Sequence, residues 1–209
     1  PVPTKGNVVP HESGTTLRLL LPVAASICNE VDVDAKGRLP DRPLEPMLGE
    51  MKAHGVTFSR DKPPFTMTGR LQGGEFGMVG DVSSQFFSGL LLAAPQCGGA
   101  TITSTTPLQS SDYVTLTTTT MADFGVTVDH TPASGTVQES FAVAANATFK
   151  GQSNYQIEGD WSNTAIWMVA AGMTGKQITI TGMNKNSVQA DRRIMQIMID
   201  AGCDVVWDG

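Results

Sequence analysis

The 209-residue sequence predicts an α/β fold built from three copies of one unit, in which helix, strand, helix and strand follow one another. Three observations support this fold class. A Gly recurs at a predicted helix-to-strand junction, a short alternating strand precedes each such Gly, and a helix led by small polar residues precedes each strand. Self-similarity of this kind along a chain is typical of a repeated structural unit.

The recurring glycines stand in segments 54–58, 124–128 and 201–205, which read His-Gly-Val-Thr-Phe, Phe-Gly-Val-Thr-Val and Ala-Gly-Cys-Asp-Val. Gly suits the C-cap of a helix because it adopts left-handed dihedral angles at no steric cost. Each segment is therefore predicted to end a helix and to begin a β-strand.

The elements upstream of each Gly follow the same order in the three copies. The alternating strands are expected at 31–34, 101–104 and 177–180. The helices before them are expected to begin near Ser13, Ser83 and Asp160, since Ser and Asp are favoured N-cap residues. One or two further strands join successive copies.

Apolar periodicity supports the helices. Two stripes at helical spacing predict amphipathic second helices in the first and third copies: Leu44, Met47, Leu48 and Met51, then Ile194, Ile197, Met198 and Ala201. Segments 86–94 and 165–171 are apolar nearly all round, which predicts buried first helices. The polar stretch 150–154 separates the second and third copies, so we expect one domain over 1–152 and another over 153–209.

Composition excludes several classes of function. With 40% hydrophobic residues, 16% charged residues and a net charge of −6, the chain predicts a packed globular core without a basic surface. It has no Lys/Arg-rich run, which argues against nucleic-acid and anionic-membrane partners, and no apolar run long enough to span a membrane. The opening residues Pro-Val-Pro-Thr-Lys-Gly are typical of the middle of a protein chain, so we expect the sequence to be a fragment.

Cysteine and histidine spacing gives no metal site. The three cysteines, Cys28, Cys97 and Cys203, form no CxxC pair and indicate a reducing compartment. The three histidines, His11, His54 and His130, are equally scattered, so we predict no metal site.

Segment 80–85, Gly-Asp-Val-Ser-Ser-Gln, places Ser83, Ser84 and Gln85 at the start of an apolar helix. Free N–H groups and the helix dipole at such a start suit an anion. The alternative is that the serines only cap the helix.

Arg42 is expected at a helix N-terminus, because Pro43 suits a first turn and Asp41 could cap it. A cation there opposes the helix dipole, which a bound carboxylate or phosphate in the guanidinium fork would explain. An ion pair between Arg42 and Asp41, or another surface acid, is the alternative.

Two further helix starts complete the candidate site. Gly14 would let a ligand approach the backbone closely, whereas Arg18, one turn later, is expected to pair with an acid. Ser110 and Tyr113 lie at the polar start of the second helix of copy two. If these starts crowd one edge of the fold, they form a concave site for a small, highly anionic, hydroxylated molecule.

Five motifs resemble those of the 5-enolpyruvylshikimate-3-phosphate synthase family, in order and over essentially the whole chain. Segment 80–86 is similar to the family's Ser-Ser-Gln motif, 13–18 to Asn-Ala-Gly-Thr-x-x-Arg, and 41–43 to Glu-Arg-Pro. Segments 157–162 and 187–191 resemble Val-Glu-Gly-Asp-x-Ser and Ser-x-Gln-Gly-Asp.

The resemblance implies an inside-out α/β barrel fold and a cytoplasmic transferase of the shikimate pathway without a cofactor. The family moves the enolpyruvyl group of phosphoenolpyruvate onto the 5-hydroxyl of shikimate 3-phosphate and releases phosphate. By this resemblance shikimate 3-phosphate is held by Ser83, Ser84 and Ser110, with Tyr113 near its phosphate. Gly14 and Arg42 then hold phosphoenolpyruvate, and Gln85 touches both substrates.

The sequence also departs from the family. It lacks the family's early Gly-Ser-Lys-Ser segment and the family's later Asp, Glu, Arg, His-Arg and Lys residues. No proton-transfer residue is therefore expected in this chain. The chain resembles the last two units of the first synthase domain (1–152) and the first unit of the second (153–209). We expect it to be inactive without the rest of the synthase chain. Glu12 and Leu19 replace the usual Asn and Pro.

Two rival interpretations remain. The enzyme that transfers enolpyruvate to UDP-N-acetylglucosamine shares the fold and one substrate, but the Ser-Ser-Gln motif is typical of the shikimate enzyme. A non-catalytic repeat module on the same scaffold would leave Arg42, Ser83 and Gln85 without a shared purpose.

Overall fold

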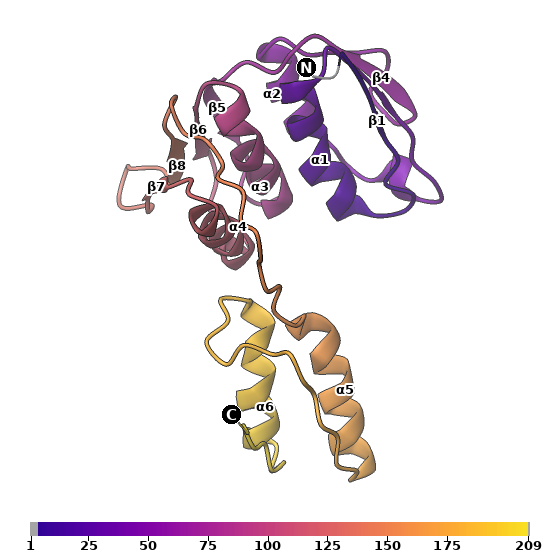
Figure 1. The fold of residues 1–209 in the computed structure, drawn as a ribbon, viewed down its shortest axis with the longest axis vertical. Coiled ribbons are helices and arrows are strands. Elements are labelled where there is room, and N and C mark those ends of the chain that lie inside the picture. Colours follow the sequence, from indigo (N-terminus) through magenta and orange to yellow (C-terminus); the bar gives the residue numbers. More distant parts are fainter. Residues whose placement is uncertain (1–3, 209) are drawn as a thin grey trace. The chain divides into compact units, whose positions relative to one another are not determined.

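The computed structural model describes residues 4–208, which form two compact units divided between Gly151 and Gln152. Unit 1 contains two four-stranded sheets and four α-helices, and unit 2 contains two α-helices, α5 and α6 (Figure 1). The fold is therefore mixed α/β, as predicted.

The first half of unit 1 runs β1 (Lys5–Val8), α1 (Gly14–Ile27), β2 (Glu30–Val33), α2 (Met47–Ala53), β3 (Thr57–Phe58) and β4 (Phe65–Thr68). Its sheet has the order β1-β2-β4-β3, in which only β1 and β2 pair in parallel. Parallel neighbours require a crossover connection, and α1 supplies it. In the register of the antiparallel pair, Val31 stands opposite Met67.

The second half repeats this design with β5 (Gly74–Met78), α3 (Ser84–Ala93), β6 (Ala100–Ser104), α4 (Ser111–Asp123), β7 (Val128–Thr131) and β8 (Ser140–Val143). The sheet order β5-β6-β8-β7 matches that of the first half, with β5 and β6 in parallel and the other pairs antiparallel. The predicted repeat is thus confirmed for the first two copies.

Helices α1 and α3 run side by side between the two sheets of unit 1 (Figure 1). Their contact is close because Gly89 of α3 has no side chain: a β-carbon there would lie 2.5 Å from the carbonyl oxygen of Arg18. Both helices are buried on the inner face, through Leu17, Leu21, Phe86, Phe87, Leu90 and Leu91. Burying one such side chain stabilises the fold by about 1.5–3 kcal/mol.

The predicted helix starts are confirmed. Ser13, Ser83 and Asp160 are the N-caps of α1, α3 and α5, and each side chain accepts a backbone N–H of its helix. The recurring glycines also behave as expected, because Gly55, Gly125 and Gly202 all have left-handed φ values, of +94°, +81° and +86°.

The second helix of the first copy begins later than predicted. Arg42 follows a short 3-10 turn (Leu39–Asp41), and α2 begins only at Met47, after Pro46. Pro43 and Pro46 explain the delay, since a Pro disfavours helical dihedral angles in the residue before it. The predicted apolar stripe is nevertheless buried, with Leu44, Met47, Leu48 and Met51 at most 5% exposed.

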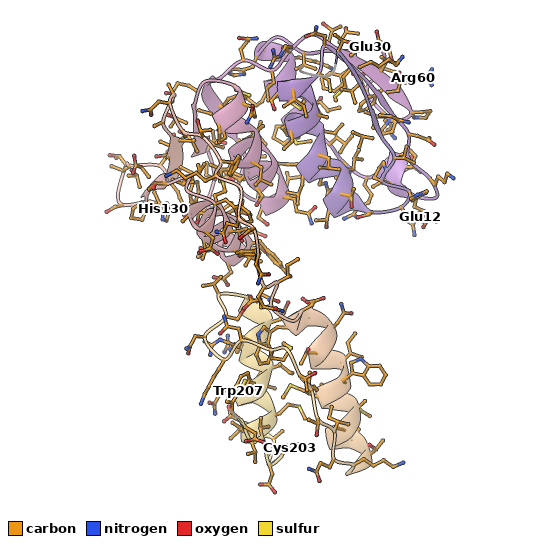
Figure 2. All side chains as sticks on the ribbon, viewed as in Figure 1. Glu12, Glu30, Arg60, His130, Cys203 and Trp207 are labelled. Atoms are coloured by element: carbon orange, nitrogen blue, oxygen red, sulfur yellow. The ribbon has the colours of Figure 1, made fainter. Side chains whose placement is uncertain are left out.

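Unit 2 contains α5 (Trp161–Thr174) and α6 (Ile194–Asp200), joined by a loop and a 3-10 turn (Ala190–Arg193). Trp161 anchors α5: its backbone N–H donates to Gln189, its indole N–H donates to the carbonyl of Asn184, and its ring stacks on Trp207. Glu158 accepts bonds from Ser187 and Gln189. Trp207 and Cys203 lie near the C-terminal end of the unit (Figure 2).

Two predictions for the third copy are wrong within the described residues. No strand forms at 177–180 or at 203–205, because no neighbouring strand offers hydrogen-bond partners there. The apolar helix α5 is not buried all round either: Ile166 and Trp167 are 67% and 66% exposed. In α6, Met198 is buried but Ile197 is 51% exposed.

No helix among residues 4–208 is long and apolar enough to cross a membrane.

Candidate functional site

Unit 1 contains a cavity of about 340 Å³ at the starts of its helices. Four separate segments contribute side chains to it, and each was expected to begin a helix. The lining residues are Arg18, Arg42, Gly80, Asp81, Val82, Ser83, Ser84, Gln85, Gln109, Ser110 and Tyr113. Six of the seven predicted site residues therefore meet in one cavity, and the seventh, Gly14, lies against Arg42.

The loop before α3 is fixed to the loop before α4. The backbone N–H of Gly80 donates to the hydroxyl of Thr106 at 2.8 Å, and the N–H of Gln109 donates to the carbonyl of Gly80 at 2.9 Å. A side chain at Gly80 would collide with the backbone of Leu108 and Thr106. Gly80 thus permits the close contact that brings the Ser83 loop and the Ser110 loop to one wall of the cavity.

Ser83 and Ser84 have different roles in α3. Ser83 caps the helix, its hydroxyl accepting the N–H of Gln85 at 3.3 Å. Ser84 is the first helical residue and is 7% exposed. Capping, the alternative reading of this motif, therefore accounts for Ser83 but not for Ser84, although both line the cavity.

Ser110 stands at the start of α4 in the left-handed conformation, with φ +56° and ψ +41°. Its side chain makes no capping hydrogen bond, so the hydroxyl stays available on the cavity wall. A non-Gly residue in this region of dihedral space is uncommon and strained. Tyr113, 49% exposed, lies one turn further along the same helix.

Arg42 does not sit at the start of its own helix, which corrects the sequence prediction. It follows the 3-10 turn, and its guanidinium lies against Gly14, the first residue of α1. The alternative ion pair with Asp41 does not form, since Asp41 pairs with Lys62 at 3.4 Å. Among residues 4–208, no acid forms a salt bridge with Arg42.

Arg18 is the residue that sequence reasoning missed. It was expected to pair with an acid, but no carboxylate within the described part of the chain bonds to it. Its Nη1 donates to Gln85 Oε1 and its Nη2 to the Pro43 carbonyl, both at 3.1 Å. An Arg on the apolar inner face of α1 is the signal that could have found it, since buried charges serve specific partners.

Two guanidinium groups and one carboxylate, from Arg18, Arg42 and Asp81, line the cavity, in a chain of net charge −6. Burial, and then the charge of nearby Arg42, lower the pKa of Arg18 below its ordinary value. Two guanidinium groups without an acid partner face the positive ends of α1 and α3, where an anion would be stabilised. The arrangement therefore suits a small anionic ligand with hydroxyl groups.

Carboxylates are scarce in the lining of this cavity. Asp81 is its only lining carboxylate within the described residues. Glu12, where the resemblance expects Asn, lies against Gly37 instead and does not line the cavity. Residues 4–208 hold no cluster of His, Cys, Asp and Glu suited to a metal ion.

Comparisons with known proteins agree with the sequence motifs. A family model described as "EPSP synthase (3-phosphoshikimate 1-carboxyvinyltransferase)" matches residues 3–209. Two relatives named 3-phosphoshikimate 1-carboxyvinyltransferase come from Clostridium kluyveri and Methanocorpusculum labreanum. The first is 38% identical and covers 96% of this chain and 46% of the relative. The second is 34% identical, and the match covers 100% of this chain and 48% of the relative.

A solved EPSP synthase structure from Acinetobacter baumannii has a TM-score of 0.68 and 21% identity, covering 95% of this chain and 43% of the other. At this identity the likeness shows the fold. The chain spans about half the length of the curated relatives that it matches.

Proposed function

The chain belongs to the EPSP synthase family, and on this premise we propose that it supplies part of the substrate site of a 3-phosphoshikimate 1-carboxyvinyltransferase. The complete enzyme would move the enolpyruvyl group of phosphoenolpyruvate onto the 5-hydroxyl of shikimate 3-phosphate and release phosphate. The rest of the synthase chain would be its partner in this activity, without a cofactor and in the cytoplasm.

One observation carries the proposal: Arg42, Ser83, Ser84, Gln85 and Ser110 line the same cavity of about 340 Å³. These residues come from three segments far apart in the sequence. A repeat module without a ligand has no need to gather an unpaired guanidinium and several hydroxyls at one place. A phosphorylated, hydroxylated substrate would use both kinds of group.

The two substrates would occupy different walls. Ser83, Ser84 and Ser110 would donate hydroxyl hydrogen bonds to shikimate 3-phosphate, with Tyr113 near its phosphate. Arg42 would bind phosphoenolpyruvate beside the start of α1, where Gly14 leaves space for the guanidinium. Gln85, whose side chain bonds to Arg18 and Thr15 of α1, would touch both substrates.

We further propose that unit 1 holds the last two repeats of the first synthase domain and unit 2 the first repeat of the second, in an inside-out α/β barrel. The equal strand orders of the two sheets support the repeat in unit 1. In unit 2 the exposed Ile166, Trp167 and Met173 support the view that further chain covers α5 in the complete enzyme.

Calorimetric titration of the chain tests the proposal. Shikimate 3-phosphate should bind, shikimate should bind much more weakly because it lacks the phosphate, and UDP-N-acetylglucosamine should not bind. Preferential binding of UDP-N-acetylglucosamine would favour the sister transferase. No binding by any of the three would favour a non-catalytic module.

Turnover gives a second test. The purified 209-residue chain should release no phosphate from the mixed substrates, because the Asp and Glu that the family uses for proton transfer are not expected in it. Adding the missing part of the synthase should restore release. Turnover by the chain alone would contradict the proposed division of the active site.

A further inference from the structure

Arg18 is a charged cavity side chain to which the proposed substrate contacts assign no specific role. It is 6% exposed and lines the cavity from the inner face of α1. Its Cζ lies 5.2 Å from the centroid of the Phe86 ring, and the helix dipoles offer it no negative pole. A cation buried this far is costly unless its donors hold defined acceptors.

The side chain of Gln85 accepts a hydrogen bond from Arg18. A guanidinium has only donors, so the amide atom that faces it at 3.1 Å must be the oxygen of Gln85. The amide nitrogen then points to α1 and donates to the hydroxyl of Thr15 at 2.9 Å. This nitrogen carries a second proton, which Thr15 does not use, on a residue that lines the cavity.

The close packing of α1 against α3 brings Arg18 to Gln85. Gly89 lies one turn after Gln85 in α3 and contacts the backbone of Arg18 directly. The second donor of Arg18 holds the carbonyl of Pro43 at 3.1 Å, next to Arg42. One side chain on α1 thereby restrains both walls of the cavity.

We propose that Arg18 is a positioning residue that fixes the Gln85 amide with its N–H group, rather than its oxygen, available to shikimate 3-phosphate. The inference rests on the proposed function of the cavity. Without Arg18 the amide could rotate and present its oxygen to the substrate. The amide oxygen would then repel the anionic substrate. Arg18 acts through Gln85 and need not contact the substrate.

The first test compares three variants by titration with shikimate 3-phosphate. Arg18→Met keeps most of the apolar stem and should weaken binding roughly tenfold, the effect of one misplaced hydrogen bond. Arg18→Lys should recover part of the loss, because an ammonium can still donate to the Gln85 oxygen. Arg70→Met is the matched control: Arg70 donates to the Ser26 carbonyl at 2.6 Å, outside the cavity lining. It should lower the melting temperature and leave affinity unchanged.

A double-mutant cycle separates positioning from direct contact. If Arg18 acts through Gln85, then Arg18→Met combined with Gln85→Ala should bind shikimate 3-phosphate no more weakly than Gln85→Ala alone. Additive losses would show that Arg18 acts on its own and would overturn the inference. Shikimate 3-phosphate is the right probe because the Pro43 contact acts on the opposite wall.

The side-chain amide signals of Gln85 in nitrogen–proton spectra give a readout that needs no ligand. Arg18→Met should shift these signals and speed their exchange with water, whereas Arg70→Met should not. Unchanged signals overturn the inference. If the signals shift but the wild-type chain does not bind shikimate 3-phosphate, only the proposed function fails. If Arg18→Met does not fold, Arg18→Lys carries the same readouts, with a smaller shift expected.

Discussion

The Nη1 atom of Arg42 occupies the space that a β-carbon on Gly14 would need, and Cζ of the same guanidinium would lie 2.9 Å from that carbon. The first residue of α1 and the cation after the 3-10 turn therefore fit together only because Gly14 has no side chain. In terms of charge the contact is unfavourable, since a helix N-terminus repels a cation. An anion bound between them would remove this conflict.

Gly14→Ala should displace the Arg42 guanidinium and weaken phosphoenolpyruvate binding about tenfold, as expected for one lost charge-assisted contact. Stability should not fall, because Ala favours a helix more than Gly does and Arg42 is a long, flexible side chain. Calorimetry and thermal melts check both expectations. Gly77→Ala is the control, since its β-carbon would meet only Thr105, at 3.9 Å. A loss of stability with normal affinity would show that the close fit serves folding.

Arg42→Ala should weaken phosphoenolpyruvate binding by roughly ten- to a hundredfold, the range for a bidentate guanidinium contact worth about 1.5–3 kcal/mol. Arg42→Lys should recover only part, because an ammonium cannot reproduce the planar fork. Titrations with phosphoenolpyruvate at low and high salt measure the effect. Arg38→Ala, on an exposed neighbour outside the cavity lining, serves as control. Equal affinities for the Arg42 and Arg38 variants would remove Arg42 from the site.

Ser83→Ala should have two effects. It removes a helix cap, which costs about 1 kcal/mol, and a cavity hydroxyl, so that shikimate 3-phosphate should bind about tenfold more weakly. Ser13→Ala separates them: Ser13 caps α1 by accepting the N–H of Thr16 at 3.2 Å but does not line the cavity. Both variants should melt a few degrees earlier, and only Ser83→Ala should lose affinity. Unchanged affinity in both would make Ser83 a structural cap alone.

Burial raises the pKa of Cys97 from 9.0 to about 11, and the charge of Arg70 opposes this shift. The thiolate is the reactive form, so at pH 8 roughly one Cys97 side chain in a thousand can be alkylated at any moment. Labelling should speed up about tenfold per pH unit up to pH 11. Because the folded pKa is raised, the group's contribution to stability is complete below pH 9 and falls between pH 9 and about 11.

Mass spectrometry of peptides after timed iodoacetamide treatment measures the Cys97 rate, with Cys97→Ser identifying the peptide. Rapid labelling of the folded chain at pH 8 would mean that the thiol is exposed. Urea-unfolded chain should react quickly at the same pH, since the burial that raises the pKa is lost.

Local signals in the sequence predicted local structure well. The caps Ser13, Ser83 and Asp160 and the left-handed Gly55, Gly125 and Gly202 are correct because each depends on dihedral angles and hydrogen bonds within a few residues. The predicted start of α2 is wrong. Pro43 by itself suits a first helical turn, but a helix that began there could not continue past Pro46.

Long-range contacts explain what the sequence could not show. Residues 177–180 have the alternation of a strand, but a strand forms only when a partner aligns with it. The sequence predicts an acid partner for Arg18, whereas its partner is Gln85. No pattern in the sequence connects these two residues, which lie 67 positions apart. The gathering of Arg42, Ser83 and Ser110 was expected only from the assumption that all copies share one topology.

The equal strand orders of the two sheets provide an internal reference for protein engineering. Strand β2 corresponds to β6, and β4 to β8, so the pair Val31–Met67 in the first sheet has its counterpart in Ile102–Phe141 in the second. The same substitution made at both places compares one architecture in two side-chain environments, within one molecule and under one set of solution conditions. Differences between the two outcomes then belong to packing and not to topology.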